Sequence, residues 1–283
     1  MGKIGLSWEL IQQSFSVLLL DTQLVFLPIA SAISCATASA ILLSGYALFF
    51  RPEIQEFFAT RPQHPQISQT VWVCFFFLYL VNYFIVIFFN VALVSAAANR
   101  LAGGNASIND GLQLAWQRKG KIFQWALLAS TVGMLLSALE ERAGWLGRLG
   151  LRILGVAWRL GSYFVVPVLV AEDLGPVEAL SESADLIRET WGEEVAGSFS
   201  FSLIFMLMAL PGIALPFILE RNLGPSGRFV GIGLTGIYFI VLAVTSATVQ
   251  GIFLAALYRY AKTKEVSFGF NRGDLAKAWQ PKN

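Results

Sequence analysis

Amide and guanidinium side chains stand inside long apolar stretches of this chain, where they could contact a solute. The candidates for a membrane-embedded site are Asn82, Asn90, Arg159 and Gln250. Asn82 and Asn90 are eight residues apart, so on a helix they lie near one face. Polar groups in lipid are costly unless they find partners or face water. We therefore expect these side chains either to hydrogen-bond neighbouring helices or to line a pathway, which Thr245, Ser246 and Thr248 would extend.

Arg159 carries a full charge into the fourth apolar stretch. It follows Arg152 by seven residues, so the two arginines lie near the same helical face. A cation at membrane depth costs at least ~2.5 kcal/mol unless it is paired, reaches the interface or faces water. Arg159 therefore either snorkels or forms a structural pair, or it attracts an anion into a cavity.

Charge is segregated along the polar connections. The segment 172–194 has eight acidic residues and one basic residue, Arg188. The segment 100–121 has four basic residues and one acidic residue, Asp110. The candidate interaction residues are the acids Glu178, Glu182, Asp185 and Glu189 and the bases Arg118, Lys119 and Lys121. Either the acidic segment docks on these bases and on the basic C-terminal tail, or it is a solvated face.

Signatures of enzymes and metal sites are missing from the sequence. There is no HExxH, GxSxG or Walker motif, and the single histidine, His64, cannot build a histidine-based zinc site. The GxGxxG pattern at 231–236 lies in an apolar stretch with no βαβ unit around it, which favours helix packing. We expect no catalytic residues, no metal and no cofactor, and an enzyme acting on lipids is a distant third hypothesis.

The composition is that of an integral membrane protein. The chain has 283 residues, of which 56% are hydrophobic and 13% charged, with a mean hydropathy of +0.64. Soluble domains contain nearer ~25% charged residues. The net charge of +2 argues against a nucleic-acid partner. Cys35 and Cys74 both lie in apolar stretches, where a thiol behaves as a small hydrophobic group.

The hydropathy pattern predicts an all-α membrane domain over 1–258 and a basic tail over 259–283. A helix needs about 20 apolar residues to cross a bilayer, and six spans are expected at about 24–50, 70–98, 122–139, 149–171, 195–219 and 229–258. Three amphipathic interfacial helices are expected before the first, third and fifth spans. In the last of them the expected apolar stripe is Val177, Leu180, Ala184, Ile187 and Trp191. All seven lysines fall on the side that holds both termini, which predicts an N-in, C-in topology.

A weak threefold repeat relates these interfacial helices. Glu9, Asp110 and Glu178 are each followed five positions later by a small residue, namely Ser14, Ala115 and Ser183. Each helix precedes a pair of spans, so three parallel units of one helix and one hairpin would explain the pattern. The match is short, and chance is the alternative.

Several phrases resemble a family of uncharacterised prokaryotic six-span membrane proteins, a domain of unknown function. They are SFSVLLLDTQLVFLP, FFNVALVSAAANRL, DGLQLAWQRKGKIFQWALLASTVG and WRLGSYFVVPVLVAEDLGPVEALSESADLIRETWGE. The resemblance extends to about Phe201, and the last two spans match in hydropathy alone. It implies the six-span fold and the prokaryotic cytoplasmic membrane, and it brings no activity or catalytic residues.

Two functions follow from these observations. The first is a channel-like or permease-like protein for a small solute or ion, in which the polar groups of the spans line a path. The second is a membrane scaffold whose charged cytoplasmic face binds a partner protein or a second copy of the chain, while the same polar groups join helices. In both cases the lipid bilayer is the surrounding partner.

Overall fold

The computed structural model describes residues 3–49, 69–189, 196–271 and 273–275, and within these ranges the chain forms helices and no strands. The segment between the first two expected spans, which contains His64, lies outside the described residues, as does Trp191. Within the described ranges, six helices are long and apolar enough to cross a membrane. They cover 22–49, 71–101, 119–142, 145–171, 204–223 and 225–263. The predicted number of spans is therefore confirmed, and the chain is a multi-pass α-helical protein.

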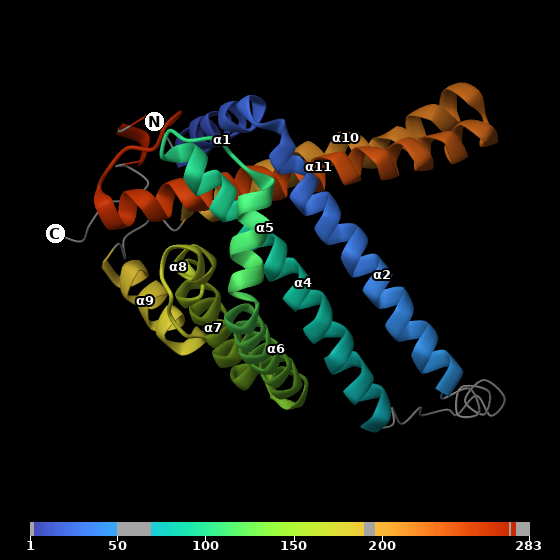
Figure 1. Cartoon of the computed structure of the whole chain (residues 1–283). Helices are drawn as coiled ribbons and strands as arrows, with labels where there is room; N and C mark the ends of the chain where they lie inside the picture. Colours follow the sequence, from blue (N-terminus) through green and yellow to red (C-terminus); the bar gives the residue numbers. More distant parts are fainter. Residues whose placement is uncertain (1–2, 50–68, 190–195, 272, 276–283) are drawn as a thin grey trace.

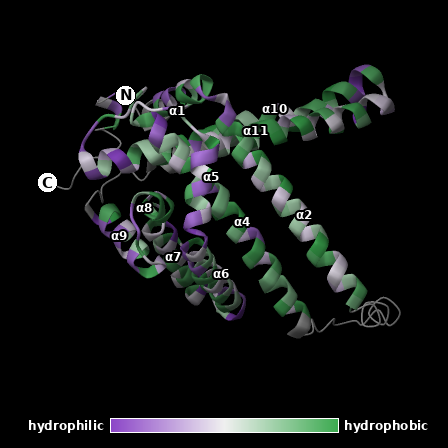
Figure 2. Cartoon of the chain, in the orientation of Figure 1, coloured by the Kyte–Doolittle hydropathy of each residue, from purple (hydrophilic) through white to green (hydrophobic). Residues whose placement is uncertain are grey.

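The spans pair as three antiparallel hairpins, which diverge from a common end (Figure 1). The first pairs α2 (Phe26–Phe49) with α4 (Gln69–Leu101), and the second pairs α6 (Lys119–Arg142) with α7 (Trp145–Gly161) and α8 (Val165–Ala171). The third pairs α10 (Ala196–Leu223) with α11 (Pro225–Thr263). Hydrophobic residues run along α2, α4, α10 and α11, as expected of helices in lipid (Figure 2).

Two segments that the sequence placed outside the spans are largely helical. The expected polar connection at 140–148 shrinks to Ala143 and Gly144, because α6 continues to Arg142 and α7 begins at Trp145. The expected tail from residue 259 begins as helix, because α11 continues to Thr263. In both places charged side chains project from helix ends and do not interrupt the backbone.

The fourth span is broken, although the sequence predicted it as continuous. Helix α7 ends at Gly161 and α8 begins at Val165, and Ser162 to Phe164 form a turn between them. The backbone N–H of Phe164 donates to Ser183 Oγ at 2.9 Å, so another helix satisfies a group that the break frees. Non-helical backbone at membrane depth is tolerated where it is enclosed by protein in this way.

Three shorter helices precede the hairpins: α1 (Lys3–Leu20), α5 (Ile108–Gln117) and α9 (Pro176–Glu189). Helix α5 packs mainly on α4, and α9 packs on α7, α8 and α6. Helix α1 packs on α10 and α11, at the other end of the chain (Figure 1). Each short helix therefore covers a hairpin other than its own, and α1 closes the arrangement by joining the first and last parts of the sequence.

The buried face of α9 differs from the predicted apolar stripe. Ala179 and Ser183 are fully buried, and Leu186 and Ile187 are nearly so, whereas Val177 is 67% exposed. Small residues on α9 let this helix approach the broken span closely, and this approach decides which face of α9 is buried. Hydrophobicity alone does not indicate which helices approach closely.

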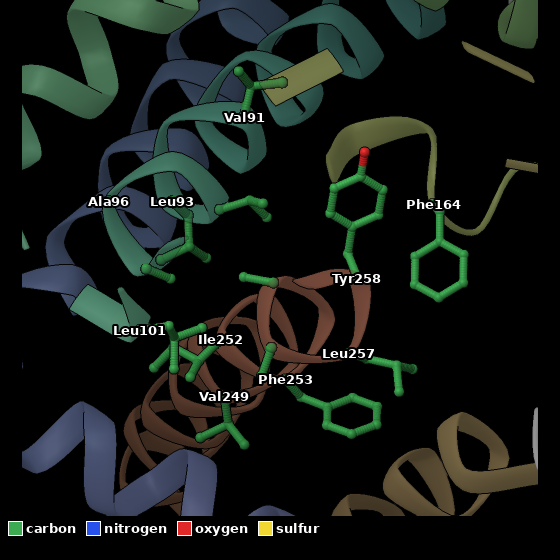
Figure 3. Packing of buried hydrophobic residues seen from close by; sticks show 14 of the residues in the cluster. Val91, Leu93, Ala96, Leu101, Phe164, Val249, Ile252, Phe253, Leu257 and Tyr258 are labelled. Carbon is green, nitrogen blue, oxygen red and sulfur yellow. The ribbon is translucent and has the colours of Figure 1, made fainter. Parts of the chain in front are cut away.

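A shared core lies where α4, α8 and α11 cross (Figure 3). Val91 and Leu93 of α4 and Ile252 and Phe253 of α11 all belong to this buried cluster. Gly251 lets the two helices approach closely, since a Cβ there would lie 2.5 Å from Leu93 Cδ2. The second helix of each hairpin thus meets the others at one place.

The segment after α11 folds back over the start of the chain. The N–H of Phe268 donates to Leu101 O at 3.1 Å, and Gln13 Nε2 donates to Asp274 Oδ2 at 2.7 Å. Leu275 is fully buried. The described part of the tail is therefore a packed strap over α1 and the end of α4.

Candidate functional site: a cavity between three hairpins

A cavity of about 490 Å³ lies between the second helices of the three hairpins. Its lining comes from α4, from the break and start of α8, and from one face of α11, where positions recur every three or four residues. The lining residues are Asn90, Val94, Tyr163, Val166, Ala243, Ser246, Ala247, Gln250, Gly251, Phe253 and Leu254. Ligand cavities typically enclose about 300–1,000 Å³, so this one is large enough for a small molecule.

The polar groups of the cavity are uncharged. Gln250 Nε2 donates to Ser246 Oγ at 2.7 Å, one turn away on α11. Within the described part of the chain the Asn90 amide has no hydrogen-bond partner, and it faces this cavity from α4. An amide at membrane depth without a protein partner is costly, so it requires water or a solute. The cavity therefore offers amide and hydroxyl groups, and no acid or base, to whatever occupies it.

The structure separates the four membrane candidates. Asn90 and Gln250 line the cavity together. Asn82 Nδ2 donates to Ser39 Oγ at 3.0 Å and to Leu78 O at 2.8 Å, so it joins α4 to α2. Arg159 is exposed on α7 and does not line the cavity. Sequence reasoning missed Tyr163, which the helix break brings to the wall, and Gly161 with Ser162 was the available signal for that break.

The ends of α8 and α11 are joined by a cluster that we term the Lys262 latch, made of Glu172, Glu182, Tyr258 and Lys262. Lys262 Nζ lies 2.8 Å from Glu172 Oε1 and also contacts Glu182 Oε1 of α9. Tyr258 donates its hydroxyl hydrogen to Glu172 Oε1 at 3.0 Å. The hydrogen bond from Lys262 lowers the pKa of Glu172, and that from Tyr258 acts in the same direction against the effect of burial. Lys262 therefore connects α11 to the end of α8 and to α9.

The end of α8 is also held from the start of α6. Arg118 donates to the carbonyl oxygens of Leu169 and Glu172, which lack partners inside the helix. Lys121 pairs with the Asp173 carboxylate and lowers the pKa of that group by hydrogen bonding. These bases therefore contact the end of span four rather than the acidic face of α9.

The other predicted interaction residues make local contacts. Glu178 accepts a hydrogen bond from Gly175 N at 2.7 Å and so caps α9. Asp185 pairs with Arg188 at 3.5 Å within α9, and Lys119 Nζ lies 3.9 Å from the centre of the Trp116 ring. Glu189 is the last residue of α9, and its side chain is outside the described ones. The predicted acids and bases do not form one continuous surface.

These features define a multi-pass α-helical membrane protein with a cavity at the meeting point of its hairpins. The chain belongs to a family described as a family of unknown function (DUF6159), which it matches over residues 69–268. The match includes α10 and α11, where the sequence resemblance was limited to hydropathy, and it begins after the phrase SFSVLLLDTQLVFLP. Neither a curated protein nor a solved structure matches the chain.

Proposed function

We propose that the protein is a permease-like or channel-like membrane protein that takes a small uncharged polar solute into the cavity lined by Asn90 and Gln250. The observation that carries this proposal is the Asn90 amide, which faces a cavity of about 490 Å³. A discontinuous helix forms part of the same wall at Tyr163, and transporters commonly place their binding sites at such breaks.

The lining favours an uncharged solute over an ion. An ion entering from water would lose its hydration shell without meeting a charge of opposite sign, which is strongly unfavourable. Amides and hydroxyls can replace the hydrogen bonds of a neutral solute, and Val94, Val166 and Leu254 can contact its apolar part. Arg159, which would have suggested an anion, lies elsewhere.

The scaffold hypothesis has less support. Lys262, Lys121 and Arg118 are engaged within the chain, so the cytoplasmic charges that would bind a partner are largely satisfied already. A bundle without a cavity would have favoured the scaffold, whereas polar groups of α4 and α11 line a cavity here.

Three parallel units, each a short amphipathic helix followed by a hairpin, account for this architecture. The equivalent positions Ser14 and Ser183 are fully buried, as is Ala115 between them in sequence order. Each unit supplies the second helix of its hairpin to the cavity wall, and each short helix covers a neighbouring unit. Such a cyclic arrangement would place the cavity near the axis that relates the units. The lysine distribution and the family resemblance support an N-in, C-in orientation in a prokaryotic cytoplasmic membrane.

The test is solute flux into liposomes that contain the purified chain. We expect uptake of neutral solutes such as urea, glycerol or small amides, with no conductance for potassium, chloride or phosphate. Asn90→Leu and Gln250→Leu should abolish the uptake. Asn222→Leu is the matched control, because that amide bonds Ile218 O at the exposed end of α10. Flux of ions but not of neutral solutes, or equal flux through all three variants, would contradict the proposal.

A further inference from the structure

Helix α7 carries an arginine stripe, which we define as Arg148, Arg152 and Arg159. With 3.6 residues per turn, spacings of four and seven place the three side chains within about 40° of one another around the helix. All three are exposed, and the Arg152 side chain is 70% exposed. Arg152 Nε pairs with Glu140 at 2.8 Å, and Arg148 Nε donates to Ala143 O at 3.0 Å. In the described ranges neither Arg148 nor Arg159 has an ion pair.

The stripe runs along a surface that is otherwise apolar. Leu149 is 53% exposed, Ile153 is 64% exposed and Val156 is 45% exposed, and no residue of α7 is buried. This helix forms the first part of a candidate span, so we expect this exposed surface to face lipid. Strong segregation of arginine from leucine, isoleucine and tryptophan is typical of helices at the boundary between headgroups and acyl chains.

Within the part of the chain that the structure describes, no carboxylate pairs with Arg148 or Arg159. In the described parts of the six spans, the acidic residues are Glu140, Glu141 and Glu220, all close to hairpin turns. Glu220 already pairs with Arg228, and Glu140 pairs with Arg152. Cations in or near hydrocarbon require a counter-charge, so an anion from outside the chain should balance Arg148 and Arg159.

We propose that the arginine stripe binds the phosphate headgroup of an anionic phospholipid. Guanidinium groups bind phosphate oxygens in pairs, and Arg148 and Arg152 stand one turn apart on the same face. Arg159 lies about 10 Å further along α7 and extends its long side chain towards the same headgroup. The acyl chains lie on the exposed side chains of Leu149, Ile153 and Val156. This site is separate from the cavity and does not depend on the proposed function.

A lipid fits the stripe better than a partner protein does. The exposed apolar residues beside the stripe match acyl chains, and the phosphate lies at the boundary where the first turns of α7 begin. A zwitterionic lipid would bring a cation together with its phosphate, so an anionic lipid is the better match for a surface that is already cationic.

The experiment is native mass spectrometry of the full chain released from detergent that contains phosphatidylglycerol or phosphatidylcholine. We expect the wild-type protein to retain phosphatidylglycerol at least about tenfold more than phosphatidylcholine, as charge-assisted phosphate contacts allow. The variant R148Q/R152Q/R159Q should lose this preference, whereas R142Q/R221Q/R228Q should keep it. The control removes the same amount of charge from exposed arginines outside the stripe.

Three further arms make the result decisive. Size-exclusion chromatography and circular dichroism show whether the variants are folded, and the single variant Arg152→Gln should give an intermediate loss if the triple variant is not. An excess of inorganic phosphate should not displace the lipid, since the acyl chains contribute to binding. Equal loss in both triple variants, displacement by free phosphate, or a second copy of the chain held by the stripe in place of lipid would overturn the proposal.

Discussion

Glu172 and Lys262 join the end of a broken span to the end of the last helix, with 2.8 Å between the carboxylate oxygen and the ammonium nitrogen. Glu172 directly follows α8, whose start forms part of the cavity wall, and Lys262 stands on the helix that supplies most of that wall. Because Lys262 also contacts Glu182 on α9, movement of α8 and α9 away from α11 requires both pairs to separate. We therefore expect the latch to limit access to the cavity from this end.

Replacing Lys262 by Met should open this end of the cavity. The pairs are about one-third exposed, so their loss should cost stability only about 0–1 kcal/mol, while the uncompensated carboxylates repel one another. The measurement is labelling by a membrane-impermeant maleimide of an Ala247→Cys cavity residue, in a Cys35→Ser and Cys74→Ser background. We expect the labelling rate to rise severalfold.

Lys119→Met is the matched control for the latch, because Lys119 contacts the Trp116 ring and no latch residue. It should leave the labelling rate unchanged. An unchanged labelling rate in Lys262→Met would show that the latch does not govern access to the cavity. The proposal of solute uptake would be unaffected, because the flux measurement tests it separately.

Acid should weaken the latch through Glu172. Its pKa is lowered in the folded chain from an ordinary value of 4.5 by the hydrogen bond from Lys262. A carboxylate of this kind stabilises the fold fully above its ordinary pKa, and the stabilisation is lost as the pH falls through the lowered value. In thermal unfolding between pH 7 and 3, wild-type protein should lose stability below about pH 4.5 by an amount that Glu172→Gln does not show.

Asp173 contributes in the same direction, because Lys121 lowers its pKa as well. The comparison with Glu172→Gln isolates the latch, since Asp173 is present in both proteins. Parallel loss of stability in the two proteins over this range would assign the acid sensitivity to Asp173 and other carboxylates.

Gly111 fixes the distance between α5 and α4. A Cβ at this position would lie 2.4 Å from the carbonyl oxygen of Ala92, and a backbone atom cannot move aside without shifting a helix. Gly111→Ala should therefore lower the free energy of unfolding by about 1–3 kcal/mol, the usual cost of overpacking. Gly120→Ala has open space around it and should be neutral or stabilising. The measurement is thermal unfolding of the two variants in the same detergent. Similar stabilities of the two variants would show that α5 can shift on α4 at little cost.

The spans were predictable because a run of about 20 apolar residues has few alternatives to crossing a bilayer. The break at Ser162 to Phe164 was not, because the apolar residues on both sides give one continuous hydropathy signal. The roles of the two asparagines were equally hidden. Spacing placed Asn82 and Asn90 near one face, but α2 reaches Asn82 and the cavity opens at Asn90. The surroundings of each asparagine depend on which helices pack against α4 at that position. Tertiary contacts, such as the close approach at Gly251, decide this packing.

Ser183 should be essential to the break in span four. Its hydroxyl oxygen accepts the N–H of Phe164 at 2.9 Å in a fully buried environment. In Ser183→Ala this buried hydrogen bond is lost, so the unfolding free energy should fall by about 1–3 kcal/mol.

Ser14→Ala is the matched control for Ser183→Ala. Ser14 is also fully buried, but its hydroxyl donates to Leu10 O of its own helix, a carbonyl that already belongs to the helical backbone. Removing it leaves no backbone N–H unsatisfied. The control should lose well under half as much stability, as measured by thermal unfolding. Equal losses would mean that buried volume, and not the hydrogen bond to Phe164, determines what Ser183 contributes.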